Sequence, residues 1–377
     1  MATGQSRDWA SVGTLEMTSL PSMAFVLSIA VLAAFWKLTR QCSPKRPAAE
    51  KIHPSSTVSK RDYEDIVNEF LQGISYQPPQ CVFDVALSSR VENHLLSHGI
   101  SPEFIKQIGR CIKTATEITT FTYPFVSHEV QEAIALYATY VISIDDLTTD
   151  ILPDLQGYVA QLVAGRPHHH ELLRGFTHFL GSQQRLFGQF GGDMIVKGTL
   201  EFISSAVIEQ GQDRCLNLTQ DAADYLVYFR AKTGVAEPFA FFFFPEDSNP
   251  EEDDLRKYIA AIPSIMLILG YVNDLLSFYK EESKVDDYPG FVQNHAQVYG
   301  LTSLQSLRQL MVETLAEVRK IRNIFFHDAA MTDRIDKFIY GYVFYHLCSR
   351  RYRLDELDIP AALESRIRYH QMVKVPQ

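Results

Sequence analysis

Cysteine is scarce in this sequence, and the few cysteines form no motif. The 377 residues include five cysteines, which are widely spaced and odd in number: Cys42, Cys81, Cys111, Cys215 and Cys348. No two of them make a CxxC pair, so the usual zinc and thiol redox motifs are excluded. Scattered thiols of this kind fit a protein that works in a reducing compartment.

Positive charge is also in short supply. Lys and Arg number 35 against 45 Asp and Glu, which gives a formal net charge of −10 at pH 7. This balance argues against a nucleic-acid partner, because nucleic-acid binders gain affinity by neutralising phosphates with many cations. Any anionic ligand would have to be bound by a few well-placed Arg and Lys side chains or by metal ions.

Alternating polar and apolar runs, which are typical of β-strands, are rare. From about Arg61 onward the apolar residues recur with a helical period, and breaks rich in Pro and Gly separate the periodic segments. Hydrophobic residues make up 46% of the chain and aromatic residues 12%, which is enough for a substantial core. We therefore predict one all-α domain over residues 61–377.

Two of the predicted helices are apolar on nearly every side. One runs through residues 126–146, with Ser127 placed to cap its amino end. The other runs through residues 249–282 and opens with Asn249 and Pro250. A helix of this kind is buried in a core or in a membrane. Two such helices among amphipathic neighbours predict a bundle with these two at its centre.

The amino-terminal 60 residues have a different composition. Residues 17–36 carry no charge, and Lys37 and Arg40 follow them. As a helix this stretch would be about 30 Å long, the thickness of the hydrocarbon core of a bilayer. The basic residues after it predict that the rest of the chain stays in the cytosol. We expect residues 1–60 to be a leader with a linker and a single transmembrane segment at about 18–36, anchored in a membrane such as the endoplasmic reticulum.

Other interpretations of this leader stay open. It could be a buried amphipathic helix, a disordered leader or a cleaved signal peptide. A signal peptide fits less well, because its positive charge should precede the apolar run rather than follow it.

Three carboxylates cluster where the first apolar helix ends. The stretch "ISIDDLTTD" carries Asp145, Asp146 and Asp150. On a continuing helix Asp146 and Asp150 share one face, and Asp145 is offset by about 100°. Such carboxylates repel each other unless a cation lies between them, and oxygen-rich sites suit Mg²⁺, especially Mg²⁺ that also binds a phosphate. The alternative is an ordinary solvated helix end.

A second set of oxygen donors follows the second apolar helix. In "GYVNDLLSFYKEE", Asn273, Ser277 and Glu281 are spaced four residues apart and share one face, whereas Asp274 points about 100° away. Their carbonyl, hydroxyl and carboxylate oxygens could together bind one hard cation near Ser277. The alternative is that the helix simply leaves the core here and becomes polar.

Taken together, "DDLTTD" and "NDLLSFYKE" resemble the two metal-binding motifs of class I terpene cyclases, an aspartate-rich motif and N-D-x-x-S-x-x-x-E. "YFRAKTGVAEP" places Arg230 where this family has its diphosphate-sensing arginine, with Thr233 and Gly234 in the effector turn beside it. "RRYRLDE" contains Arg351 and Tyr352, which resemble the Arg-Tyr pair that closes the site. The residues within "NDLLSFYKE" and "RRYRLDE" are most similar to those of the fungal trichodiene synthase family.

The resemblance covers about residues 61–360, and it departs from the family pattern at one point. The fifth position of the aspartate-rich motif is Thr149, and the acid is displaced to Asp150. The resemblance therefore implies that Asp145 is the metal ligand of this motif. Asp146 would act through contacts with its neighbours, and Asp150 is the weakest candidate.

The resemblance implies a class I terpenoid synthase bundle around a central active-site cavity, and a sesquiterpene cyclase that ionises farnesyl diphosphate and releases diphosphate. Three Mg²⁺ ions would hold the diphosphate, on Asp145 and on the Asn273, Ser277 and Glu281 stripe. A homodimer is common in such families. The residues implied to be catalytic are Asp145, Arg230 and Tyr352, and those implied to bind the diphosphate are Arg230, Lys280, Arg351 and Tyr352.

Aromatic side chains should line the chamber in which a carbocation is handled, because aromatic faces stabilise cations and exclude water. Tyr137 and Val141 lie two turns and one turn before Asp145, so we expect them on the pocket wall. Phe121 and residues 239–244 are further aromatic candidates.

Two rival functions remain open from the sequence. A prenyl diphosphate chain-elongating synthase would need a second D-D-x-x-D, where this chain has Asn273-Asp274-Leu-Leu-Ser277. A non-catalytic, membrane-anchored helical scaffold would explain the apolar helices, but it would leave both oxygen stripes and the Arg-Tyr pair unexplained.

Overall fold

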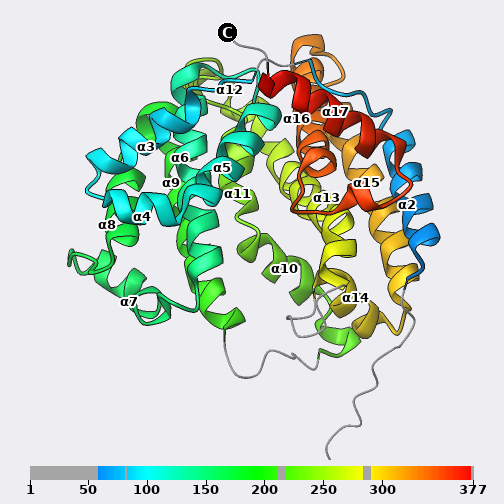
Figure 1. Ribbon diagram of the computed structural model, residues 1–377, viewed down its shortest axis with the longest axis horizontal. Helices are drawn as coiled ribbons and strands as arrows, with labels where there is room; N and C mark the ends of the chain where they lie inside the picture. The colour runs from blue at the N-terminus through cyan, green and yellow to red at the C-terminus, as the bar shows by residue number, and fades with distance from the viewer. Residues whose placement is uncertain (1–57, 81–82, 211–217, 283–289, 375–377) are drawn as a thin grey trace, which may run out of the picture. The chain divides into compact units, whose positions relative to one another are not determined.

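The computed structural model describes residues 58–80, 83–210, 218–282 and 290–374, and all regular structure in these ranges is helical (Figure 1). The all-α prediction is therefore confirmed. The described residues form one compact unit. The predicted transmembrane segment at 18–36 lies outside the described residues and stays a prediction.

The helices, in chain order, are α2 (Lys60–Gly73), α3 (Leu87–Ser97), α4 (Pro102–Gln107), α5 (Gly109–Thr122), α6 (His128–Leu147), α7 (Leu152–Val163), α8 (Glu171–Leu180), α9 (Gln184–Glu209), α10 (Asp224–Thr233), α11 (Ala236–Phe241), α12 (Glu251–Tyr258), α13 (Ile262–Glu282), α14 (Phe291–Tyr299), α15 (Ser303–Ile324), α16 (Ala329–Cys348) and α17 (Pro360–Lys374). Short 3₁₀ turns lie at Gln220–Ala222, Ile259–Ala261 and Leu354–Glu356.

Side-chain caps fix where several of these helices begin. The Ser127 hydroxyl accepts a hydrogen bond from the Val130 amide at the start of α6, as the sequence predicts. Thr302 and Gln305 form a reciprocal capping box on α15. Each cap satisfies backbone amides that have no partner inside the helix. Capping of this kind sets the register of the long helices and therefore the positions of their far ends.

The two helices predicted to be central are buried in the bundle. α6 packs against α5 and α3, and α13 packs against α15, α11 and α16. In Figure 1, α6 and α9 lie on one side of the bundle, α13 and α16 lie on the other, and α10 and α11 lie between them. The carboxyl ends of α6, α9 and α13 point toward the same side of the bundle, whereas α10 begins near that side and its carboxyl end leads inward to α11.

The apolar segment 249–282 is two helices and not one. α12 ends at Tyr258, a 3₁₀ turn follows, and α13 begins at Ile262 with Pro263 in its first turn. Proline lacks the amide hydrogen that a helix interior requires, so it marks a helix start. By length and composition Glu251–Glu282 could cross a membrane, but 61% of its most apolar window is buried inside the protein, as expected for a core helix.

α9 contains a break, and a side chain from α12 caps the part of the helix that follows it. Phe187 and Gly188 leave the helical conformation, and Gly188 has a φ of 73°. The carboxylate of Glu251 then accepts hydrogen bonds from the amides of Phe190 (3.0 Å) and Gly191 (2.6 Å). The second part of α9 therefore starts with a charged cap supplied by α12, and it runs on to Glu209.

Candidate active site

The first predicted motif lies at the carboxyl end of α6, but only part of it is helical. Asp145 and Asp146 are in the last turn and are exposed, and α6 ends at Leu147. The Thr148 hydroxyl donates to the carbonyl oxygens of Ile144 (2.6 Å) and Asp145 (3.1 Å), which satisfies the helix end.

Asp150 therefore lies in the turn beyond the helix. The expectation that Asp146 and Asp150 share one helical face is wrong, because the Thr148 side chain helps to end the helix before Asp150 is reached. Asp150 is exposed at that turn.

Cations from three other elements lie within electrostatic reach of Asp145. Its side chain is reached by solvent, yet enough protein surrounds it that burial raises the pKa of its carboxyl, as does the charge of Asp146. Arg351, Lys280 and Arg230 act in the opposite direction and lower that pKa. The structure thus brings together the end of α6 with α10, α13 and the segment after α16.

Asp146 has different neighbours from Asp145. An Arg351 Nη2 lies 3.7 Å from Asp146 Oδ1, and the buried Cys111 thiol donates to Asp146 Oδ2 at 3.5 Å. Asp146 therefore connects the aspartate-rich turn to Arg351 and to α5.

The second motif lies in the last two turns of α13. Ser277 is buried, and its hydroxyl has no hydrogen-bond partner among the described residues. Asn273 and Glu281 are half-buried on the same face, one turn before and one turn after it. An unpartnered buried hydroxyl is unfavourable, and here it lies on the same helix face as two further oxygen donors, so this face is suited to bind a cation.

Asp274 is turned away from this stripe and binds Arg230 instead. Arg230 Nε donates to Asp274 Oδ1 at 2.8 Å and to Oδ2 at 3.0 Å, and both side chains are largely buried. Burial raises the pKa of Asp274 to about 6, although Arg230 opposes this shift. The Arg230 guanidinium also donates from Nη2 to Asn273 Oδ1 at 3.1 Å. α10 and α13 are therefore joined through the predicted diphosphate sensor.

The predicted effector turn leaves room for Arg230. Thr233 ends α10, Gly234 follows it, and Val235 has a left-handed φ of 51° before α11 begins. A β-branched residue rarely adopts such a φ, so this turn is strained. A Cβ on Gly234 would overlap Nη1 of Arg230. A side chain at this position would therefore displace the guanidinium of Arg230.

The Arg-Tyr pair follows α16. Tyr352 is buried, and its ring centroid lies 4.3 Å from that of His346. Lys280 Nζ lies 5.8 Å from the Tyr352 ring centroid. Arg351 is exposed beside Asp146. Lys280, Arg351 and Tyr352 are therefore neighbours, as a shared role in binding one anion would require.

Glu209, the last residue of α9, is a candidate that the sequence analysis missed. Burial raises the pKa of its carboxyl to about 7, the charge of Asp145 raises it further, and Arg230 opposes the shift. Glu209 therefore lies within electrostatic reach of both residues. A lone Glu at a helix end has no distinctive spacing, so only the packing of α9 beside α10 reveals it.

His346 is the second missed residue. It is wholly buried on α16, and its Nε2 lies 3.2 Å from Asn273 Nδ2. Burial lowers the pKa of His346 to about 3. The sequence offered no signal for it, because a His on an apolar helix is usually an ordinary core residue.

Tyr137 and Val141, expected on the pocket wall, are both buried. The Tyr137 hydroxyl lies 2.8 Å from Thr199 Oγ1, and its ring packs against Phe239 and Phe242. Phe121 is likewise buried, against Phe344. These side chains are part of the buried aromatic core, and their place on a pocket wall stays a prediction.

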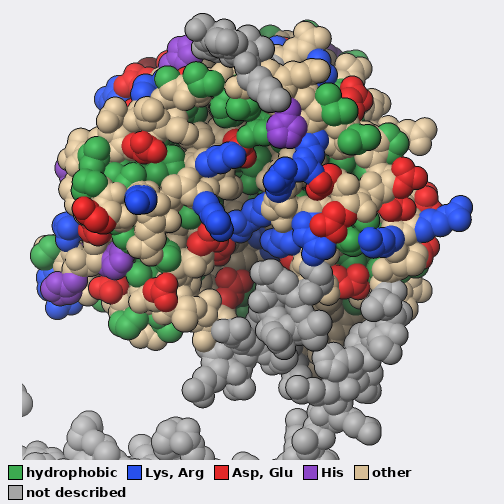
Figure 2. Space-filling view, in the orientation of Figure 1, with side chains coloured by type: hydrophobic (Ala, Val, Ile, Leu, Met, Phe, Trp, Pro, Cys, Tyr) green, Lys and Arg blue, Asp and Glu red, His purple; other side chains and the backbone are tan. Residues whose placement is uncertain are grey.

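Basic side chains gather in the middle of one face of the bundle. Figure 2 shows Lys and Arg side chains around a hollow there, with Asp and Glu side chains beside and below them. Among the described residues no three His, Cys, Asp or Glu side chains form a cluster that could hold a metal ion. A cation here would therefore need amide and hydroxyl donors as well as carboxylates, which is what Asn273, Ser277 and Glu281 provide.

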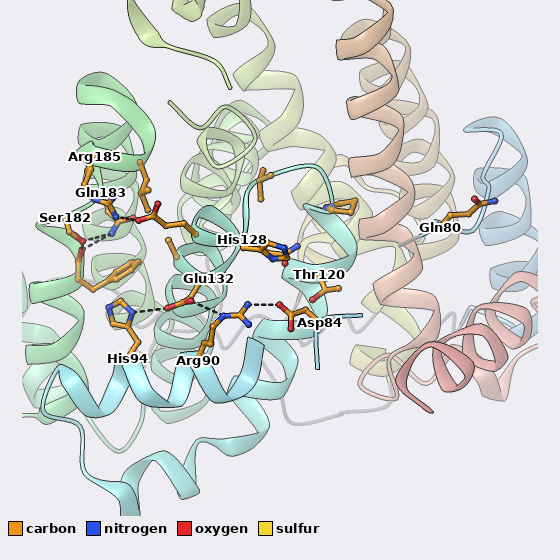
Figure 3. A pocket seen from close by; sticks show the side chains of 17 residues that line it. Gln80, Asp84, Arg90, His94, Thr120, His128, Glu132, Ser182, Gln183 and Arg185 are labelled. Carbon is orange, nitrogen blue, oxygen red and sulfur yellow. Dashed lines mark hydrogen bonds and ion pairs between the residues drawn. The ribbon is translucent and has the colours of Figure 1, made fainter. Parts of the chain in front are cut away.

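A separate cavity of about 1120 Å³ opens at the other end of α6 (Figure 3). His128, Glu129 and Glu132 line it from the first turns of that helix, about 20–25 Å from Asp145 by the helix rise. Its charged side chains pair among themselves: Arg90 with Asp84 at 2.6 Å, Arg90 with Glu132 at 3.1 Å, and Arg185 with Glu129. None of the predicted site residues line it.

Comparison with known proteins agrees with this arrangement. The family model described as Trichodiene synthase (TRI5) matches residues 90–372. An (E)-beta farnesene synthase from Metarhizium brunneum (strain ARSEF 3297) is 37% identical over 307 residues, which cover 81% of this chain and 93% of that protein. A trichodiene synthase from Stachybotrys chartarum is 27% identical over 278 residues, 72% of each chain.

A solved structure shares the fold. The linalool/nerolidol synthase from Streptomyces clavuligerus superposes with a TM-score of 0.53 at 13% identity, over 72% of this chain and 98% of that one. This likeness confirms the class I terpene synthase bundle. With the family match and the relatives, it leads to one conclusion: the chain belongs to the trichodiene synthase family and is a terpene synthase.

Proposed function

We propose that the protein is a sesquiterpene cyclase that ionises farnesyl diphosphate and releases inorganic diphosphate. The observation that carries this proposal is the meeting of Asp145 with Arg230, Lys280 and Arg351 beside the Asn273, Ser277 and Glu281 stripe. Carboxylates facing cations from three elements suit a ligand that brings its own metal ions and a large negative charge.

The donor set fits Mg²⁺, because oxygen ligands of this kind are those it prefers and the buried Ser277 hydroxyl has no partner in the described part of the chain. Asn273, Ser277 and Glu281 would hold one ion, and Asp145, with Glu209 nearby, would hold others; we propose three ions in all. When bound, Mg²⁺ would neutralise the diphosphate and make it a better leaving group.

The cationic side chains bind the group that leaves. When the allylic carbon–oxygen bond breaks, its electron pair goes to the diphosphate oxygen, and negative charge builds up there. Arg230, Lys280 and Arg351 are donors suited to that charge, and guanidinium groups bind phosphates with paired hydrogen bonds. The remaining carbocation cyclises and then either loses a proton to give a hydrocarbon, or takes up water and loses a proton to give an alcohol.

The test incubates the full-length protein with C10, C15 and C20 prenyl diphosphates and Mg²⁺, and measures diphosphate release and volatile products by gas chromatography and mass spectrometry. We expect turnover of the C15 substrate to a cyclic C15 product. An acyclic C15 product would support terpene synthase activity but would contradict the proposed cyclisation. An elongated prenyl diphosphate would favour a chain-elongating synthase, and no diphosphate release from any substrate would contradict the proposal.

Membrane attachment and dimer formation are separate proposals that depend on the sequence alone. The uncharged run at about 18–36, followed by Lys37 and Arg40, supports a single-pass anchor with the catalytic domain in the cytosol. Cell fractionation of the full chain and of a variant without residues 18–36 tests the anchor. Recovery of the full chain in the soluble fraction would reject it. Light scattering tests the homodimer.

A further inference from the structure

His346 lies between the proposed metal site and the Arg-Tyr pair, and neither motif accounts for it. It is wholly buried in the last two turns of α16. On one side its Nε2 is 3.2 Å from Asn273 Nδ2 on α13. On the other side its ring lies 4.3 Å from the ring of Tyr352. A buried ring with both nitrogens engaged at such a place has a defined orientation.

The hydrogen bonds around His346 allow only one assignment of donors and acceptors. Its Nδ1 is 2.8 Å from the carbonyl oxygen of Tyr342, and because a carbonyl only accepts, Nδ1 carries the hydrogen. The other ring nitrogen, Nε2, then presents a lone pair. The side-chain group of Asn273 that faces a lone pair at 3.2 Å must be its NH₂ group.

The opposite side of the same amide gives the same answer independently. Arg230 Nη2 is 3.1 Å from Asn273 Oδ1, and a guanidinium only donates, so the atom facing it must be the oxygen. A rotated amide would place its oxygen against the lone pair of His346 and its NH₂ group against the Arg230 cation. Both hydrogen bonds would be replaced by repulsions, so the rotated form is strongly disfavoured.

We infer that His346 is a positioning residue that holds the Asn273 amide with its oxygen facing the metal site. Of the two polar atoms of an amide, only the oxygen can bind a cation, so a freely rotating Asn273 would be a poor ligand. Arg230 would no longer orient the Asn273 amide when its guanidinium binds diphosphate. His346, in contrast, is held on α16 by its hydrogen bond to the Tyr342 carbonyl. Groups that orient a metal ligand typically change metal affinity by about 10- to 100-fold.

This inference rests on the proposed function, and its test measures binding rather than turnover. Mg²⁺ is titrated into the full-length protein with inorganic diphosphate present, and the Mg²⁺ midpoint is read from calorimetry and from the increase in Tm. We expect His346→Phe, which keeps the ring but removes the acceptor, to raise that midpoint at least about tenfold. His346→Gln, whose side-chain oxygen can reach the position of Nε2, should recover most of the affinity.

A double-mutant cycle separates orientation from packing. Asn273→Asp carries two equivalent oxygens and needs no orienting, so adding His346→Phe to it should change the midpoint far less than it does beside Asn273. His168→Phe is the matched control. His168 is buried in the loop between α7 and α8 and stacks on Tyr158 of α7, so this substitution should leave the midpoint unchanged.

The outcomes distinguish the inference from the proposed function. If the wild-type protein shows no Mg²⁺-dependent diphosphate binding, the metal site and the inference both fail. If the wild-type protein binds and His346→Phe binds equally well, or the cycle shows full additivity, only the inference is overturned. If His346→Phe does not fold, His346→Asn replaces it, because the Asn side chain is too short to reach Asn273. Equal Mg²⁺ midpoints for the Asn and Gln variants would then overturn the inference.

Discussion

At the scale of single residues, Ser277 stands out within the proposed metal stripe. Its hydroxyl is buried and unpartnered among the described residues, and it lies between Asn273 and Glu281 on one helix face. A buried hydroxyl without a partner lowers the stability of the folded protein. We therefore attribute Ser277 to function, as a metal ligand, and not to folding.

We therefore predict opposite effects of Ser277→Ala on stability and on function. Removing the unpartnered oxygen should leave Tm unchanged or raise it slightly, because no hydrogen bond is lost. The same change should lower kcat/KM with farnesyl diphosphate by at least about tenfold, since a metal ligand is removed. A lower Tm combined with wild-type kcat/KM would indicate an ordinary structural Ser.

Glu209 should make the metal-free protein sensitive to pH. Its pKa is raised from 4.5 to about 7 in the folded protein, so the folded state holds a proton that the unfolded state has lost between these values. The stabilisation is complete below about pH 4.5 and is lost as the pH rises through about 7. Urea unfolding in EDTA should thus show a smaller free energy of unfolding at pH 8 than at pH 6.

Glu209→Gln provides the control for this pH dependence. Gln cannot titrate, so the drop in unfolding free energy between pH 6 and pH 8 should become smaller in this variant. An unchanged pH profile would mean that Glu209 titrates normally and does not lie against Asp145.

At the scale of elements, the break between α10 and α11 positions Arg230. Gly234 has a φ of −85°, which any residue can adopt, so glycine is required only for space. Gly234→Ala should therefore fold, but it should push the guanidinium away from Asp274. We expect kcat/KM to fall by about 10²-fold, the typical effect of misplacing a binding group by about 1 Å.

Gly109→Ala is the matched control for this substitution. A Cβ at Gly109, in the first turn of α5, would meet no atom within 4 Å, so kcat/KM should stay at the wild-type value. Equal kcat/KM for both variants would show that the turn does not control Arg230.

The cap that α12 supplies to α9 should be measurable as stability. Glu251 accepts from two backbone amides at the start of the second part of α9. Glu251→Ala should lower the free energy of unfolding by about 1–2 kcal/mol, in the range of other lost helix caps. Its exposed neighbour Glu252 makes no such bond, so Glu252→Ala should change it by less than about 0.5 kcal/mol. Similar losses in both variants would contradict the capping role.

At the scale of the whole molecule, periodicity and spacing predicted the all-α bundle and the helix that carries Asn273, Ser277 and Glu281. Both predictions depend on the spacing of residues within single helices, and this spacing can be read directly from the sequence. The end of α6 was predicted less well, because Thr148 ends the helix before Asp150. The length of 249–282 was also misjudged, since Pro263 starts a new helix inside an unbroken apolar run.

Glu209 and His346 could not be predicted, because their roles exist only between elements. Glu209 matters through its distance from Asp145 on another helix, and His346 through hydrogen bonds that join α16 to α13. Nothing in the residues around either one distinguishes it from a helix-end carboxylate or a core histidine.

The hydrogen bond between Arg230 and Asn273 has a thermodynamic consequence. Arg230 Nη2 donates to Asn273 Oδ1, the atom proposed to bind Mg²⁺, so the guanidinium and the cation compete for one oxygen. A cation that takes this oxygen releases a donor of Arg230, and the acceptor best matched to that donor is the diphosphate. Metal and diphosphate should then each increase the affinity of the other by the same factor, as linkage requires.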